Sequence, residues 1–377
     1  MVEITHGLHD DWELLDPSAP LPATAASLRA AEGRVPGEQL TFLIRENGSP
    51  VAGLYGTVTT NVKPYEMFNL HQVVTGTDSI FPWSDESRRE RAALGAGRIP
   101  ASWEPSLIVM YPSYACLPVG PAAEVEIYVE SLVAAAVDWA RDAGMRSVAF
   151  LYVSAQPNLL SAVLRRTEFY RIPLSYNSIL GITGSTFDDY LRALPAKRRR
   201  MIRWERRQLE SSEITFSLRP LPDCLDDVVR LRCALVRKYR GEVDDQSERQ
   251  RLLHITKLLS DFEVGVFCAE YRHEVLGFSL FHGHQGVWYP YWTGTDYDHP
   301  RHRLVYFETL FYRPIQVAAA SGVRAIEYGH GSWPVKRSRG CELVPLDGWV
   351  LPLDHELVEP TKTSARISRL VEYSPHA

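Results

Sequence analysis

The sequence contains few cysteines, and none of them belongs to a paired motif. Five cysteines are scattered over 377 residues, and no two of them have the CxxC spacing. A disulfide framework uses an even set of cysteines, and a structural zinc site usually contains CxxC pairs. We therefore expect neither disulfides nor a metal site, and we expect a reduced protein that works in the cytoplasm.

Long apolar runs and targeting signals are also lacking. A membrane-spanning helix takes about 20 apolar residues, and no run approaches that length, so no membrane span is expected. The segment from Met1 to Gly7 has neither the basic nor the apolar region of a secretory signal peptide. The formal net charge of −5 provides no overall attraction to nucleic acid, so any contact of that kind has to be local.

The motifs of several large enzyme classes are missing as well. The chain has no GxSxG elbow, no HExxH motif, no P-loop and no GxGxxG motif. Amide formation from an ester or a thioester is compatible with these absences, because it needs no covalent nucleophile. It needs an amine aligned with a carbonyl, a route for the amine proton, and hydrogen-bond donors for the oxyanion.

One pattern is present twice. Residues 128–152 and 306–330 both begin with Tyr, continue with Glu and Leu at matching places in a helical pattern, and reach Gly and Arg before an apolar strand. Gly144 and Gly322 stand where a helix C-cap is expected. A repeated helix and strand of this kind indicates a duplicated α/β domain.

A hairpin pattern precedes each copy, at residues 40–55 and 264–280, and Asn47-Gly48 is typical of a hairpin turn. The predicted fold is α/β (α+β), with two tandem domains that each contain a mixed twisted sheet flanked by helices. The predicted domains are residues 1–183 with an insert at about 61–105, residues 184–360 with the basic helix and the active site, and a loosely ordered tail at 361–377.

A basic helix is predicted at residues 197–209, with seven positive charges against one negative charge. Lysine and arginine neutralise phosphates, and an aromatic residue among them can stack on a base. A solvated helix face is the alternative interpretation. The residues predicted to contact RNA are Lys197, Arg198, Arg199, Arg200, Arg203, Trp204 and Arg207.

Five segments follow one another in an order that resembles a known family. They lie at residues 106–121, 187–207, 299–308, 322–331 and 336–345. Together they resemble the FemAB-like branch of the GNAT acyltransferase superfamily, which is often labelled peptidoglycan biosynthesis or recognition. The resemblance implies tandem GNAT-like domains. It also implies amide formation, in which an acyl group, carried in several members by an aminoacyl-tRNA, passes to an amine.

Three residues are predicted to be catalytic. The resemblance associates a lysine at the place of Lys336 with the acyl donor or the oxyanion, whereas a surface lysine in a basic loop is the alternative. Glu308 is expected near His299 and His302, where it would take a proton, and its alternative role is to serve a helix N-terminus. His330 lies between two glycines at a strand end and would act as a base through water, unless it is an ordinary loop histidine.

An aromatic strand at residues 288–292 carries rings in both alternation phases. We expect one face of this strand in the core and the other along the substrate. In the strand that follows the second helix, only one of Glu327 and Tyr328 should point toward the cleft. The predicted substrate-binding residues are Tyr291, Trp292, Tyr306, Tyr328 and Arg337.

These features lead to three hypotheses. The first is an N-aminoacyltransferase that needs no cofactor and passes an amino acid from aminoacyl-tRNA to an amine of a small molecule, peptide or cell-wall precursor. The second is an N-acyltransferase with a coenzyme A thioester, which residues 295–306 disfavour because they place Pro300 and acidic residues where phosphate-binding amides are wanted. The third is a non-catalytic ligand-binding protein, which would have no need of Lys336.

Overall fold

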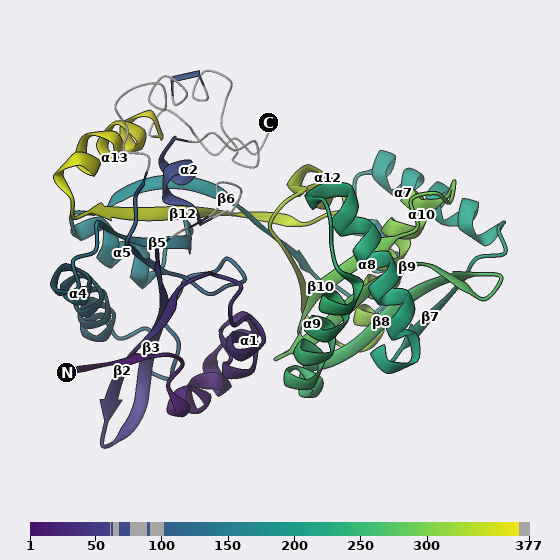
Figure 1. Cartoon of the computed structure of the whole chain (residues 1–377). Helices are drawn as coiled ribbons and strands as arrows, with labels where there is room; N and C mark the ends of the chain where they lie inside the picture. Colours follow the sequence, from purple (N-terminus) through teal and green to yellow (C-terminus); the bar gives the residue numbers. More distant parts are fainter. Residues whose placement is uncertain (61, 63–67, 76–88, 91–101, 369–377) are drawn as a thin grey trace. The chain divides into compact units, whose positions relative to one another are not determined.

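The chain forms two compact units. The computed structural model describes residues 1–60, 62, 68–75, 89–90 and 102–368, which exclude most of the predicted insert at 61–105. Unit 1 is Met1–Asn177 together with Val344–Ala377, and unit 2 is Ser178–Leu343 (Figure 1). The predicted second domain extends to residue 360, whereas in the structure residues 344–360 belong to unit 1.

Unit 1 is a mixed sheet with helices packed on it. Its strand order is β1–β2–β3–β4–β5–β12–β6. The strands are β1 Val2–His6, β2 Glu38–Glu46, β3 Ser49–Thr59, β4 Ser106–Val109, β5 Ser147–Ser154, β6 Tyr170–Gly181 and β12 Glu342–Pro352. The helices are η1 Asp10–Ser18, η2 Leu21–Ala23, α1 Ala25–Ala30, α2 Leu70–Thr75, α4 Glu126–Asp142, α5 Leu159–Arg166 and α13 His355–Ser368.

Local sequence signals explain several of these elements. Asn47 and Gly48 have φ angles of 50° and 84°, which the predicted two-residue hairpin turn between β2 and β3 requires. Gly144 ends α4 with a φ of 70°, as predicted for a helix C-cap. The predicted loose tail is helical as far as Ser368, because α13 buries an apolar face and the Ser364 hydroxyl donates to the Val74 carbonyl at 2.7 Å.

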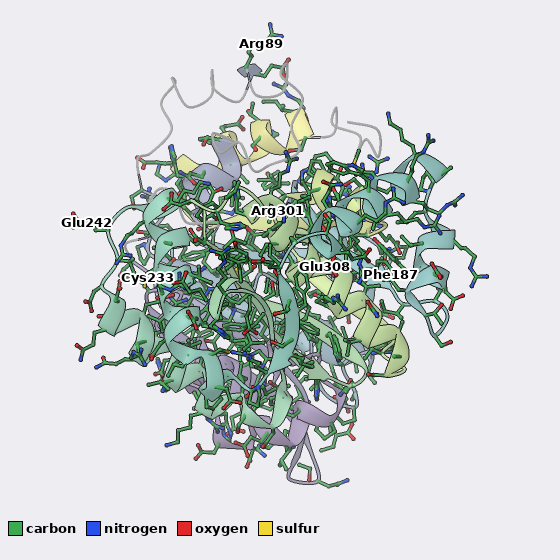
Figure 2. The ribbon with its side chains drawn as sticks, turned by 90° about the vertical axis from the view of Figure 1, so that its right-hand side faces the viewer. Arg89, Phe187, Cys233, Glu242, Arg301 and Glu308 are labelled. Carbon is green, nitrogen blue, oxygen red and sulfur yellow. The ribbon has the colours of Figure 1, made fainter. Side chains whose placement is uncertain are left out.

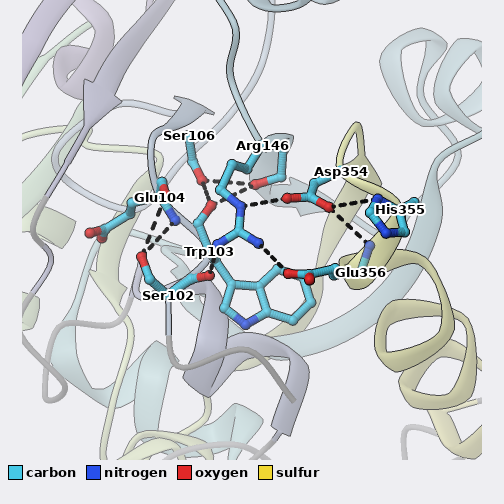
Figure 3. A network of polar contacts seen from close by, with 9 residues as sticks. Ser102, Trp103, Glu104, Ser106, Arg146, Asp354, His355 and Glu356 are labelled. Atoms are coloured by element: carbon cyan, nitrogen blue, oxygen red, sulfur yellow. Dashed lines mark hydrogen bonds and ion pairs between the residues drawn. The ribbon is translucent and has the colours of Figure 1, made fainter. Parts of the chain in front are cut away.

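Arg146 fastens α13 to the start of β5 (Figure 3). Its Nε donates to Asp354 at 2.7 Å, its Nη2 donates to Glu356 at 3.2 Å, and its Nη1 donates to the Ser102 carbonyl at 2.6 Å. The backbone N–H of Glu356 and then Arg146 lower the pKa of Asp354. These contacts give Arg146, which belongs to the repeated pattern, a structural role in the first copy.

Unit 2 is also a mixed sheet covered by helices (Figure 1), and its strand order is β6–β11–β10–β9–β8–β7. The other strands are β7 Thr215–Arg219, β8 Glu263–Tyr271, β9 Glu274–His284, β10 Val287–Thr295 and β11 Ala325–Gly329. The helices are α6 Phe187–Ala193, α7 Ala196–Glu210, η3 Leu221–Cys224, α8 Leu225–Arg240, α9 Asp245–Leu258, η4 Ser260–Phe262, α10 His302–Phe307, η5 Glu308–Tyr312, α11 Arg313–Ala320 and α12 Trp333–Arg337.

The predicted duplication is present. The first copy runs β2, β3, β4, α4, β5, and the second runs β8, β9, β10, a helix made of α10, η5 and α11, then β11. The two helices differ, because the middle of the second one, η5, is a π-helix. The parallel strands differ too: β4 pairs with β5 over four residue pairs, whereas β10 pairs with β11 over only two.

Candidate active site

The separation of β10 from β11 is the central feature of unit 2. The two parallel strands pair at Val287 with Ala325 and at Trp288 with Ile326, and their described residues form no further pairs. The ladder between the two parallel strands is therefore short, although both strands lie inside the sheet. We therefore take this region as the candidate active site.

A β-bulge follows the separation. Pro290 pairs with Phe281 and Trp292 pairs with Leu280, so Tyr291 is the extra residue. A bulge shifts the alternation of side chains. Trp288 accordingly packs with Phe281 in the core, while Trp292 lies on the opposite face of the sheet. The bulge therefore explains why aromatic side chains of β10 lie on both faces of the sheet.

Lys336 holds the end of β11. Its side chain is buried on the short helix α12, and its Nζ donates to the carbonyls of Tyr328, Gly329 and His330 at 2.7, 3.1 and 2.5 Å. An ammonium has three N–H donors, so these bonds use all of them. Burial lowers the pKa of Lys336 to about 8. A contact between Lys336 and an oxyanion would require one of these bonds to open.

The other predicted residues near Lys336 differ in exposure. Tyr328 is buried and stacks on Phe311 with 4.6 Å between the ring centroids. Its hydroxyl has no hydrogen-bond partner among the described residues, and burial raises its pKa well above the usual value. His330 and Arg337 are half-buried. The structure therefore brings Lys336, Tyr328 and His330 together, with Arg337 next along the chain.

Glu308 forms ion pairs with two arginines and not with His299 or His302. Its carboxylate is 2% exposed and forms ion pairs with Arg206 at 3.1 Å and Arg313 at 3.0 Å. Burial raises the pKa of Glu308, and Arg206 and then Arg313 oppose that shift. Glu308 begins η5, and π-helical turns of this kind are frequent at functional sites. Arg206 also lies over the ring of Phe187, which Figure 2 labels together with Glu308.

Arg339 is a buried residue that no sequence pattern singles out from the neighbouring Arg337. Its guanidinium lies 3.5 Å from the ring centroid of Phe307 and 3.8 Å from a carboxylate oxygen of Glu205. Glu205 also accepts a hydrogen bond from the Tyr312 hydroxyl. Tyr306 is half-buried nearby, and its pKa is raised by burial, which Arg339 opposes. Its ion-pair and ring partners are distant in sequence, whereas its hydrogen bonds to Val335 and Ser338 are local, so only the fold shows that it is internal.

The basic helix α7 has an anchored face and an exposed face. On the anchored face, Glu205 pairs with Arg339, and Arg206 pairs with Glu308. The exposed face carries Lys197, Arg200, Arg203, Trp204 and Arg207, and we refer to these five residues as the basic stripe. Their spacing of three or four residues along most of the stripe places them on one side of the helix.

The cations of the basic stripe are weakly paired. Lys197, Arg200 and Arg207 have no polar partner within the described part of the chain, and Arg203 reaches Asp188 only at 3.9 Å. Trp204 is 52% exposed. Two of the predicted RNA contacts are turned elsewhere: Arg199 donates to the carbonyl of Leu194 at 2.6 Å, and Arg198 contacts the Met201 sulfur.

The face of β10 opposite the Phe281 core carries a different set of charges. Helices α8 and α9 pack side by side, and α8 covers β10 (Figure 1). Arg232 from α8 and Arg251 from α9 lie 5.4 and 5.1 Å from the ring centroid of Trp292. Glu248 pairs with Arg232 at 3.0 Å and with Arg251 at 3.7 Å. Trp292 is thus buried beside two cations that share one anion.

Two classes of feature are absent from the described residues. Within these ranges, no group of His, Cys, Asp and Glu side chains is arranged to hold a metal ion. None of the helices that the structure describes is long and apolar enough to cross a membrane.

Comparison with known proteins identifies relatives of this architecture. The model of the FemAB-like family, described as peptidoglycan biosynthesis and recognition, matches residues 103–360. The structure of FemX is similar over 95% of this chain and 99% of its own, with a TM-score of 0.61 and 10% identity. A conserved protein of unknown function from Bacteroides thetaiotaomicron is similar over 93% of this chain and 99% of its own, with a TM-score of 0.55 and 10% identity.

A tandem GNAT protein from the clavulanic acid biosynthesis pathway is similar over 93% of this chain and 98% of its own, with a TM-score of 0.47 and 12% identity. The sequences of curated proteins contain no match to this chain. The chain belongs to the FemAB-like family, because the family model covers more than half of it. The predicted resemblance and the predicted tandem GNAT-like α/β fold are confirmed, and family and fold together support an acyltransferase.

Proposed function

We propose that the protein is an N-aminoacyltransferase that moves an aminoacyl group from aminoacyl-tRNA to an amine of a small molecule or a cell-wall precursor. The observation that carries this proposal is the basic stripe. Its four cations and its exposed tryptophan combine phosphate contacts with a stacking surface, which is the combination that single-stranded nucleic acid requires. The reaction belongs in the cytoplasm, where aminoacyl-tRNA is available.

The length of the basic stripe supports an extended polyanion as the donor. Lys197 and Arg207 are ten residues apart on one helix, which corresponds to about 15 Å at 1.5 Å per residue. A single pyrophosphate would use only part of that length. The contacts of Glu205 and Arg206 fasten the inner face of the helix to Arg339 and Glu308, so the stripe is held on the same unit as the candidate active site.

The chemistry that we propose is direct aminolysis. The acceptor amine attacks the ester carbonyl, the ester C–O bond breaks, and the amine proton leaves with the tRNA hydroxyl. We place the acyl group where β10 and β11 separate. Lys336 acts there as a positioning residue, because it holds the carbonyls of Tyr328, Gly329 and His330 in one arrangement. Its positive charge also favours a developing oxyanion nearby.

The salt dependence of tRNA binding tests the proposal. The variant Arg200→Gln/Arg203→Gln/Arg207→Gln removes three charges of the stripe, and Arg165→Gln, an exposed arginine of α5, is the matched control. We expect the magnitude of the slope of log K against log salt to fall by roughly 0.7–0.9 for each phosphate that the helix no longer neutralises, which amounts to about two to three in the triple variant. The control should keep the wild-type slope.

Two results would contradict this proposal. An unchanged slope in the triple variant would show that the stripe is only a solvated face. Stabilisation of the wild type by coenzyme A, but not by charged tRNA, in a thermal shift assay would favour the acyl-CoA alternative.

A further inference from the structure

His282 on β9 is a buried imidazole without a polar partner. It is 1% exposed, and neither Nδ1 nor Nε2 has a hydrogen-bond partner in the described structure. Burial lowers the pKa of His282 to about 4, so the ring is neutral and has one donor and one lone pair. Buried polar groups are normally bonded, so His282 needs a partner that the described residues do not supply.

The position of His282 relates it to the candidate active site. Its ring centroid lies 5.4 Å from that of Tyr291, with the two planes at 89°. Tyr291 is the bulged residue of β10, and its ring is also 5.4 Å from that of Trp292. Bulges often lie beside active sites, where they aim a side chain. His282 therefore lies beside the bulge, next to the residues of β10 that no longer pair with β11.

The same region is partly open to solvent. Tyr289, Pro290 and Tyr291 are half-buried in the middle of β10, between the buried Trp288 and Trp292. His282 is in register with Tyr289. The Tyr291 ring, which contacts that of His282, therefore lies between His282 and the half-buried stretch of β10.

Charges next to this stretch define what a ligand there would carry. Arg232 and Arg251 flank Trp292, and Glu248 pairs with both of them. Arg251 is the more loosely paired of the two arginines, at 3.7 Å from Glu248 against 3.0 Å for Arg232. Arg251 is 53% exposed and can bind an acidic group that arrives from solvent.

We propose that His282 binds the acceptor amine of the transferase, and that the acceptor also carries an acidic group, carboxylate or phosphate, which Arg251 binds. This inference rests on the proposed aminoacyl transfer. The imidazole lone pair accepts a hydrogen bond from the amine, and Tyr291 and Trp292 form the wall between the two contacts. His282 orients the amine and does not retain its proton.

Surrogate nucleophiles separate this inference from the proposed function. Hydroxylamine is small and attacks an activated ester without an acceptor site, so formation of aminoacyl hydroxamate from charged tRNA by the full chain, above the uncatalysed background, reports donor activation alone. L-Lysine and phosphoethanolamine, each an amine with an acidic group, then serve as acceptor probes, and L-lysinamide is the control without the carboxylate.

The variant His282→Phe keeps a ring and removes the nitrogens. We expect it to keep hydroxamate formation and to raise the KM for L-lysine by about two- to tenfold, the range for one hydrogen bond between neutral groups, with a much smaller change in kcat. His282→Gln, which retains an acceptor, should restore part of the loss. Arg251→Gln should raise the KM for L-lysine but not for L-lysinamide, whereas Arg249→Gln on the same helix, where Arg249 pairs with Asp226, should change neither.

Use of neither L-lysine nor phosphoethanolamine by a wild type that forms hydroxamate would contradict the inferred class of acceptor. Absence of hydroxamate formation in the wild type would contradict the proposed function itself. If hydroxamate forms, but His282→Phe uses L-lysine as well as the wild type does, or loses both reactions in parallel, His282 does not bind the acceptor. If the wild type prefers L-lysinamide to both acidic probes, the inferred acidic group is wrong.

Discussion

Replacing Lys336 by Met should loosen the end of β11, and the geometry sets the size of the effect. The ammonium donates to three carbonyls, and hydrogen bonds to a charged group are worth about 1.5–3 kcal/mol each. Water can replace the bonds to the half-buried Gly329 and His330, and the variant no longer has to bury a charge. We therefore expect a net local loss of about 2–4 kcal/mol.

Hydrogen exchange is the appropriate measurement, because the predicted effect is local and a chain of two units need not unfold in one step. A loss of about 2–4 kcal/mol corresponds to about 30- to 700-fold faster exchange, since 1.4 kcal/mol is a factor of ten. The amides from Gly329 to Cys341 should show this acceleration. Amides of β8 and β9 should exchange at wild-type rates.

Arg337→Met is the matched control for Lys336→Met. Arg337 is the next residue, it is half-buried, and the described residues include no polar partner for its side chain. We expect a change within about 0.5 kcal/mol. If Lys336→Met exchanges like the wild type while its turnover falls by about 10²–10³, the range for an oxyanion donor, the positioning role is refuted and the ammonium contacts the reacting group.

Two further predictions follow from the same part of unit 2. Burial lowers the pKa of Lys336 to about 8 from 10.5, so the folded chain binds fewer protons than the unfolded chain between these values. The stability of the wild type over Lys336→Met should therefore increase from pH 8 to pH 10, as the urea transition of unit 2 would show. A difference that narrows would contradict the direction of the shift. Glu205→Gln leaves Arg339 buried without its anion and should cost about 3 kcal/mol by the same method, whereas Glu213→Gln, whose partner Arg272 is exposed, should cost no more than about 0.5 kcal/mol; equal costs would refute a buried pair.

The duplicated architecture could be predicted because its signals are local. Asn47-Gly48 specifies a turn by its own backbone preferences, and Gly144 and Gly322 end their helices with φ angles of 70° and 69°. Thr186 begins α6 with a capping box to Asp189. Each of these features depends on residues within a few positions of one another, so the sequence pattern was sufficient.

The environment of the candidate site could not be predicted in the same way. Lys336, Arg337 and Arg339 look equivalent in a basic loop, yet Lys336 and Arg339 are buried and Arg337 is not. The burial of Arg339 involves a partner distant in sequence, Glu205. The bulge at Tyr291 also has no simple signal, although Pro290, which cannot donate to a sheet ladder, is compatible with one.

The two copies of the duplicated unit have diverged at the positions that chemistry would use. Glu130 is exposed and pairs with Arg166, so the glutamate of the first copy contributes only a surface ion pair, whereas Glu308 is buried between two arginines on a π-helical turn. The parallel strands of the first copy pair along the whole of β4, but those of the second copy separate after two residue pairs. Burying charge and interrupting a sheet both cost stability, and a copy that only had to fold would have no reason to retain either. This contrast is why we place the proposed reaction in unit 2.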